Sequence, residues 1–112
     1  DRVTPSGRIG PAIAAIEKVL AAAPDHPGAI HLYIHLTEAS ADPWRAEAPA
    51  DRLAALMPGQ GHIVHMPSHT YYRIGRFRDS LASNVAAAAA DEAYIAASGT
   101  AEALYANAYY PH

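Results

Sequence analysis

No cysteine occurs among the 112 residues, and phenylalanine and tryptophan occur once each. Without cysteine the chain can form neither a disulfide framework nor a thiolate metal site. Any metal ion would therefore have to be held by imidazole, carboxylate or phenolate groups. Alanine is the most frequent hydrophobic residue, and because its small side chain favours helices, we expect closely packed helices.

An excess of positive charge is also missing, since 8 lysines and arginines stand against 11 aspartates and glutamates and the net charge is -3. There is no basic stripe and no basic amphipathic helix, so the composition predicts neither nucleic acid nor a membrane as partner. The chain has no run of about 18 apolar residues, the length that would predict a membrane span. The opening residues DRVTPSGRIG are polar and do not resemble a signal peptide.

Apolar residues recur at helical spacing, whereas no segment alternates as a strand would, so the sequence predicts an all-α fold. Pro27 suits the first position of a helix, with Asp25 or His26 as its cap. Pro49 is either a kink or a helix start, and Pro67 breaks a helix and is expected to splay the residues on either side of it. The expected helices cover about 10–23, 27–40, a segment ending near 56, 61–74, 78–97 and 100–109.

Several residue types recur at a step of 34 positions. Pro24 and Pro58 are 34 apart, and the small residues Ala12, Ala46 and Ser80 follow the same step. A looser series comprises Ile16, Ala50 and Asn84. A period of about 34 residues is the length of the tetratricopeptide helix pair.

On these residues the chain resembles the tetratricopeptide repeat family, whose unit is a pair of antiparallel helices with small residues at the crossing and a closing proline. Tyr71, Gly75 and Ala87 also fall where the family prefers an aromatic, a turn glycine and an alanine. The resemblance implies an array of about two and a half repeats in a single domain over 1–112. Its parts would be a disordered or tag-like lead at 1–7, repeats at about 8–24, 27–58 and 61–97, and a partial repeat at 100–112.

Two stretches, HPGAIHLYIH at 26–35 and GHIVHMPSH at 61–69, each contain a His-x-x-x-His pair. His31 and His65 are 34 apart, and so are His35 and His69, so the two pairs occupy equivalent places in consecutive repeats. A spacing of four places both imidazoles on one face of a helix, as in helical zinc enzymes. The alternative is histidines that only pack together, which is costly in a dry groove and repulsive if they are protonated.

In the tetratricopeptide family the first helices of successive units line a concave groove, and the resemblance implies that the four paired histidines face it. Four further residues take groove-facing places by the same resemblance: His62, Glu38, Tyr72 and Arg73. His62 is either a metal ligand or simply the start of its helix. Three neighbours are expected outside the site, namely His26 as a helix cap, Tyr71 in the core and Arg76 on a turn surface.

The groove residues offer several roles. Glu38 follows His35 by three positions, so it can be a ligand, a partner that orients an imidazole, a base that takes a proton from bound water, or a solvated carboxylate. Tyr72 and Arg73 can stabilise an oxyanion or a phosphate. Zinc is the default metal because no redox signal is visible, but imidazole also binds manganese, iron, copper and nickel.

A narrower resemblance rests on three motifs, HPGAIHLYIH, GHIVHMPSH and the terminal YANAYYPH. They are similar to motifs in a group of bacterial tetratricopeptide proteins that are considerably longer than this chain and whose function is poorly described. The resemblance implies that the sequence stops inside a repeat and that His112 is a further candidate ligand. Uncapped ends with apolar faces predict self-association as a homodimer.

These residues together predict a metal-dependent hydrolase. A metal-bound water of lowered pKa beside Glu38, Tyr72 and Arg73 suffices to hydrolyse a small phosphoester or a related activated ester. No Ser-His-Asp signature, phosphate-binding glycine loop or nucleotide fingerprint is present. The alternatives are a non-catalytic scaffold that binds a peptide or a metal, and a copper or non-haem iron redox protein.

Overall fold

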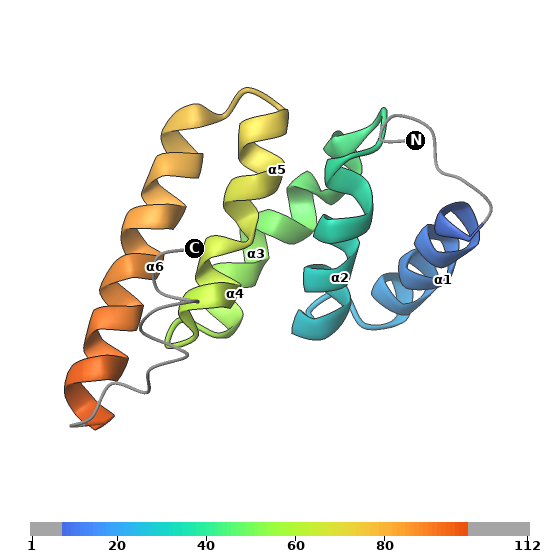
Figure 1. The fold of residues 1–112 in the computed structure, drawn as a ribbon. Coiled ribbons are helices and arrows are strands. Elements are labelled where there is room, and N and C mark those ends of the chain that lie inside the picture. The colour runs from blue at the N-terminus through green and yellow to red at the C-terminus, as the bar shows by residue number, and fades with distance from the viewer. Residues whose placement is uncertain (1–7, 99–112) are drawn as a thin grey trace.

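The computed structural model describes residues 8–98, and all the regular structure in that range is helical (Figure 1). The all-α prediction is therefore confirmed. None of the helices in this range is both long and apolar enough to cross a membrane. The elements in chain order are α1 (Ile9–Ala22), α2 (Pro27–Glu38), the 3-10 helix η1 (Pro43–Ala46), α3 (Glu47–Leu56), α4 (Gly61–His65), α5 (Pro67–Arg73) and α6 (Phe77–Ser98). The short helix expected at 100–109 lies outside the described residues.

Prolines and one histidine set the helix boundaries. Pro27 is the first residue of α2, and the Nδ1 of His26 accepts a hydrogen bond from the Ala29 N–H at 3.1 Å, so His26 caps this helix as expected. Pro49 lies in the first turn of α3, where its missing N–H costs no helical hydrogen bond, so it marks a helix start rather than a kink.

Pro67 divides the helix expected at 61–74 into α4 and α5. Its missing N–H removes one hydrogen bond of the helix. Met66, between α4 and α5, nevertheless keeps right-handed helical angles, φ −53° and ψ −40°. Pro67 therefore interrupts the hydrogen bonding of the helix, but the residue between α4 and α5 stays helical.

Helix α2 lies at the centre of the molecule. It packs against α1 on one side and against α3 and α5 on the other, while α6 packs along α4 and α5 on the far side (Figure 1). Ile30, Ile34, Leu53 and Met66 are fully buried where these helices meet. Because burying an aliphatic side chain contributes about 1.5–3 kcal/mol, these residues fix α2 against α3 and α5.

Two glycines allow the close approach of α6. Gly75, between α5 and α6, has a φ of +86°, a conformation that only glycine adopts without strain. At Gly61, the first residue of α4, an added Cβ would overlap the buried carboxylate of Asp91 on α6. The missing side chain at Gly61 thus lets the histidine-bearing helix α4 rest directly on α6.

Candidate metal centre

Five histidines gather between α2 and the α4–α5 segment. His31 and His35 come from α2, His62 and His65 from α4, and His69 from α5. The apolar faces of these helices are buried against each other, which directs the imidazoles to one shared side. His112 lies outside the described residues.

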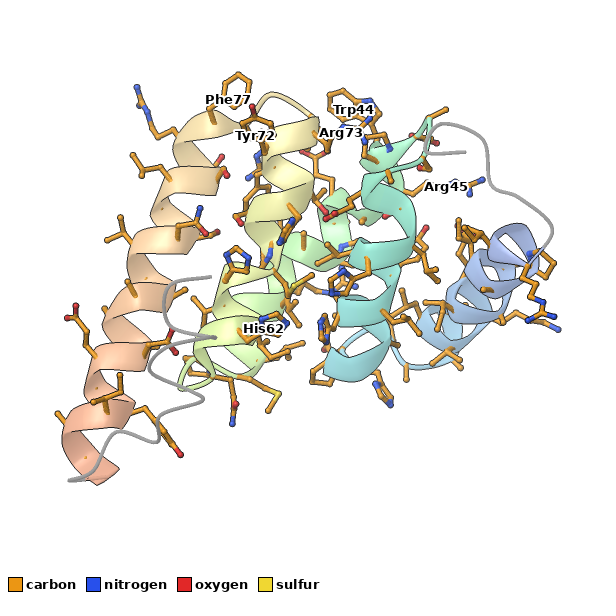
Figure 2. All side chains as sticks on the ribbon, viewed as in Figure 1. Trp44, Arg45, His62, Tyr72, Arg73 and Phe77 are labelled. Atoms are coloured by element: carbon orange, nitrogen blue, oxygen red, sulfur yellow. The ribbon has the colours of Figure 1, made fainter. Side chains whose placement is uncertain are left out.

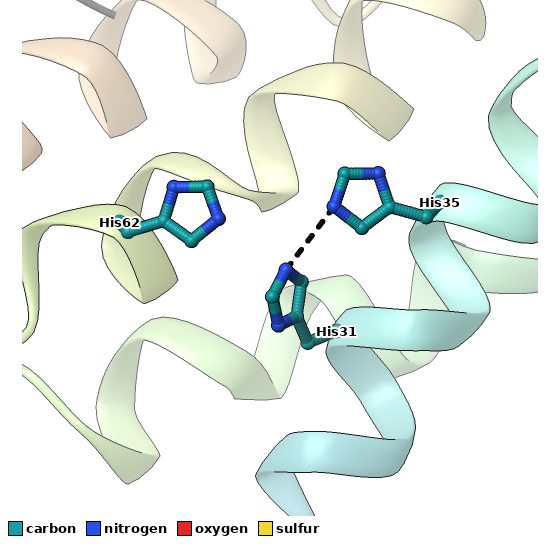
Figure 3. Close-up of side chains that lie close together, drawn as sticks. All are labelled: His31, His35 and His62. Atoms are coloured by element: carbon teal, nitrogen blue, oxygen red, sulfur yellow. Dashed lines mark hydrogen bonds between the residues drawn. The ribbon is translucent and has the colours of Figure 1, made fainter. Parts of the chain in front are cut away.

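His31, His35 and His62 form the first group, in which one ring nitrogen from each residue lies within 4.8 Å of the other two (Figure 3). The Nε2 atoms of His31 and His35 are 3.1 Å apart, and the ring of His62 meets that of His31 at a centroid distance of 5.1 Å. Two nitrogens that bind one ion at about 2.0–2.1 Å are separated by about 3.0–3.4 Å. These three imidazoles can therefore hold a metal ion after small side-chain rotations.

The second group consists of His65 and His69, whose Nε2 atoms are 2.9 Å apart. The expected splaying of this pair by Pro67 is not found, because its spacing matches the 3.1 Å of the uninterrupted pair on α2. The helical angles at Met66 explain the agreement, since they preserve the one-turn relationship across the break. The two groups are neighbours, with ring centroids 6.3 Å apart for His35 and His69.

Burial, and then the positive charge that His35 carries when protonated, lower the pKa of His31 below its usual value. A lowered pKa favours the neutral imidazole at neutral pH. The neutral ring is also the form that binds metal ions. The surroundings of His31 thus favour its ligating state.

Glu38 contacts the second group. Its Oε2, which is shielded from solvent and accepts no hydrogen bond, lies at an ion-pair distance of 2.9 Å from the Nδ1 of His69, so a small rotation of the ring would form the bond. A carboxylate that accepts the Nδ1–H of an imidazole orients the ring and leaves its Nε2 to face a metal ion. Among the roles open to Glu38, this contact favours the partner that orients an imidazole.

A cavity of about 410 Å³ opens beside the second group. The three residues predicted to act on a substrate, Glu38, Tyr72 and Arg73, line it together with both histidines of this group. Its lining comprises Glu38, His65, His69, Tyr72, Arg73 and Asn84, with Ser68 and Ser80. The structure thus brings the substrate-binding candidates to His65 and His69 rather than to His31, His35 and His62.

Tyr72 and Arg73 line the cavity and lie at the end of α5, where Tyr72 is next to Phe77 (Figure 2). Tyr72 is 66% exposed, and its ring packs edge-on against Phe77. The Arg73 guanidinium donates to the backbone oxygens of Glu38, the last residue of α2, and of Ser40 just beyond it. Arg73 therefore ties α5 to the end of α2 and supports the backbone that carries Glu38.

Asn84 on α6 is a site residue that the sequence reasoning missed. Its Oδ1 lies 2.7 Å from the Nδ1 of His65. The sequence did contain a sign of its role. Asn84 follows Ile16 and Ala50 at the step of 34 positions, and it is polar where these two residues are apolar. A polar residue at an otherwise apolar repeat position marks a place where packing does not decide the side chain.

Arg76 differs from the expected turn-surface residue. Its guanidinium pairs with the carboxylates of Asp79, Glu47 and Asp51 at 2.9 to 3.0 Å. It also covers the ring of Tyr71 at 4.4 Å, and Tyr71 is buried as predicted. The acidic residues of α3 come close only in the folded chain, so this network could not be predicted from the local sequence.

No family model, curated protein or solved structure matches this chain in the comparisons. The candidate site is therefore defined by its own geometry.

Proposed function

We propose that this chain binds a divalent metal ion through His31, His35 and His62 and hydrolyses small phosphoesters or related activated esters. The observation that carries the proposal is the convergence of three imidazole nitrogens within 4.8 Å, next to a cavity lined by a carboxylate, a phenol and a guanidinium. Zinc suits thiol-free imidazole ligation without a redox role, and manganese, iron, copper and nickel are the other candidates.

The bound ion would supply a water of lowered pKa and polarise the substrate oxygen. The chain's own residues would bind and orient the substrate. The exposed Tyr72 hydroxyl can donate to a phosphoryl oxygen at the mouth of the cavity. Arg73 adds positive charge there while it holds α5 against α2. Glu38 keeps His69 oriented beside the reacting group.

The test is a phosphoesterase assay on protein that has been stripped with a chelator and then reloaded. We expect activity on an aryl phosphate to disappear on stripping and to return with about one to two equivalents of zinc. Hydrolysis that is unaffected by complete metal removal would overturn the proposal. Metal binding without hydrolysis of any phosphoester or activated ester would instead favour a metal-binding scaffold.

The proposed architecture is a short tetratricopeptide-like array. Support comes from the order of packing, because α2 is followed by α3 and the α4–α5 segment by α6, and each pair packs together. The equivalent histidine pairs lie on the first helix of each pair, as a repeat of 34 residues requires.

We further propose that two copies associate through the outer face of α6. Phe77, Leu81 and Val85 follow one another at a spacing of four and are 60%, 64% and 62% exposed. Such an apolar row is where a following repeat would stack in an array. A second copy would cover the same row in a symmetric dimer.

A further inference from the structure

We propose a second metal site, held by His65 and His69 and oriented by Asn84 and Glu38, so that the chain binds two neighbouring ions. The inference rests on the proposed metal binding but not on the proposed hydrolysis. It assigns the cavity-facing ion to the second group and gives Glu38 and Asn84 positioning roles.

Both rings of the second group have an oxygen close to Nδ1. The Nδ1 of His69 faces the Glu38 carboxylate at 2.9 Å, and the Nδ1 of His65 faces the Asn84 carbonyl oxygen at 2.7 Å. The contact with Glu38 is an ion-pair distance and not a formed hydrogen bond, and the Ser68 hydroxyl also lies 3.4 Å from the Nδ1 of His65. We assign the hydrogen of each ring to Nδ1, because only that tautomer lets both oxygens act as acceptors. In a neutral imidazole the lone pair is then on Nε2.

The space between the two rings fits one metal ion. The two Nε2 atoms are 2.9 Å apart. Two lone pairs directed at each other at this distance repel, whereas a cation that both can bind turns the same arrangement into a chelate. An ion about 2.0–2.1 Å from each nitrogen fits this spacing.

The second group lies apart from the first. His65 and His69 lie outside the group of three whose nitrogens all fall within 4.8 Å of one another. The adjoining rings of the two groups, His35 with His69 and His62 with His65, have centroids 6.3 and 6.2 Å apart. This separation suits two adjacent ions better than one shared ion, since paired catalytic ions lie about 3.5–4 Å apart.

The cavity adjoins the second group alone. His65 and His69 line it, and His31, His35 and His62 do not. Two protein nitrogens leave at least two positions of the second ion for water and substrate oxygens, because zinc takes at least four ligands. An anionic oxygen that enters the cavity from the Tyr72 end would therefore meet the second ion first.

Zinc titration of the metal-free protein against a competing chromophoric chelator tests this inference. Wild type should take up two equivalents, and His65→Ala with His69→Ala should take up one. Asn84→Leu should lower the affinity for the second zinc ion by about 10- to 100-fold, as the loss of other groups that orient a ligating histidine does. The affinity for the first ion should not change. Asn84 is exposed, so its replacement does not disturb the core.

The matched variant is Asn84→Asp. Because its carboxylate can only accept the hydrogen of Nδ1, this variant should bind the second zinc ion as tightly as wild type or more tightly. A single equivalent in wild type would overturn the second site and leave the proposed function standing. No zinc uptake at all would overturn both. Equal uptake by wild type and the His65→Ala, His69→Ala protein would also overturn the assignment, because the second ion would then lie elsewhere.

Discussion

Histidine serves two different purposes within one stretch of ten residues. The ring of His26 accepts from the backbone of Ala29 at the start of α2, whereas His31 and His35 project together from the middle of the same helix. The difference follows from position, because only the first turn of a helix offers N–H groups without helical partners. A count of histidines therefore overstates the ligand set, and the contact that each ring makes decides its role.

Replacing His31 with alanine should lower zinc affinity by about 100-fold or more, since it removes a ligand rather than a residue that orients one. His26→Ala is the control. It should leave affinity unchanged and reduce the free energy of unfolding by about 0.5–2 kcal/mol through the lost cap. Zinc titration and urea denaturation measure the two effects. Equal losses of affinity in both variants would show that the cluster has been assigned wrongly.

Two buried phenols make stability depend on pH. Tyr33 and Tyr71 donate to Glu17 and Asp51 at 2.7 Å, and burial first, then these hydrogen bonds, raise the pKa of both phenols. Because the folded pKa is the higher one, their contribution is complete below the unfolded pKa of about 10 and is lost as the pH rises above it.

The free energy of unfolding should therefore fall as the pH rises above about 10, and Tyr71→Phe should reduce this fall while costing about 1 kcal/mol at pH 8. Urea denaturation at several pH values gives both quantities. An unchanged pH slope in the Tyr33→Phe, Tyr71→Phe double variant would contradict the assignment.

Among the helices, those with strong boundary residues were the most predictable. Pro27 and His26 fixed the start of α2, and the repeated spacing of four correctly grouped the paired histidines on shared faces. The contacts of Glu38 with His69 and of Asn84 with His65 join separate helices. They depend on how α2 and α6 pack beside α4 and α5, which no local pattern encodes. The effect of Pro67 was overestimated: a proline disfavours helical angles in the residue before it, yet Met66, which is fully buried in the core, keeps them.

The contact of α4 with α6 gives a prediction for Gly61. Gly61→Ala should lower the free energy of unfolding by about 1–3 kcal/mol, because the added Cβ meets the Asp91 carboxylate and pushes α4 away. Gly10→Ala is the matched control, since no atom lies within 4 Å of its added Cβ and alanine favours the helix by about 0.5–1 kcal/mol. Thermal unfolding of both variants provides the comparison. A stabilised Gly61→Ala protein would contradict the close approach.

At the scale of the whole molecule, the exposed row on α6 bears on assembly. Light scattering should report about twice the chain mass of 11.8 kDa for wild type. Leu81→Glu with Val85→Glu should give monomers, because two charges would be buried in the contact. Ala86→Glu, which adds a charge on another side of α6, should stay dimeric. A monomeric wild type at about 100 μM would rule out the dimer, since homodimers of physiological strength form well below that concentration.

The whole account depends on a metal ion at the histidine cluster. Crystals grown with zinc, with diffraction data collected on both sides of the zinc absorption edge, locate any bound ion directly. The account predicts an anomalous peak within about 2.0–2.1 Å of the Nε2 atoms of His31 and His35, with His62 as a further ligand. A fully ordered cluster without such a peak, at a zinc concentration well above that of the protein, would contradict it.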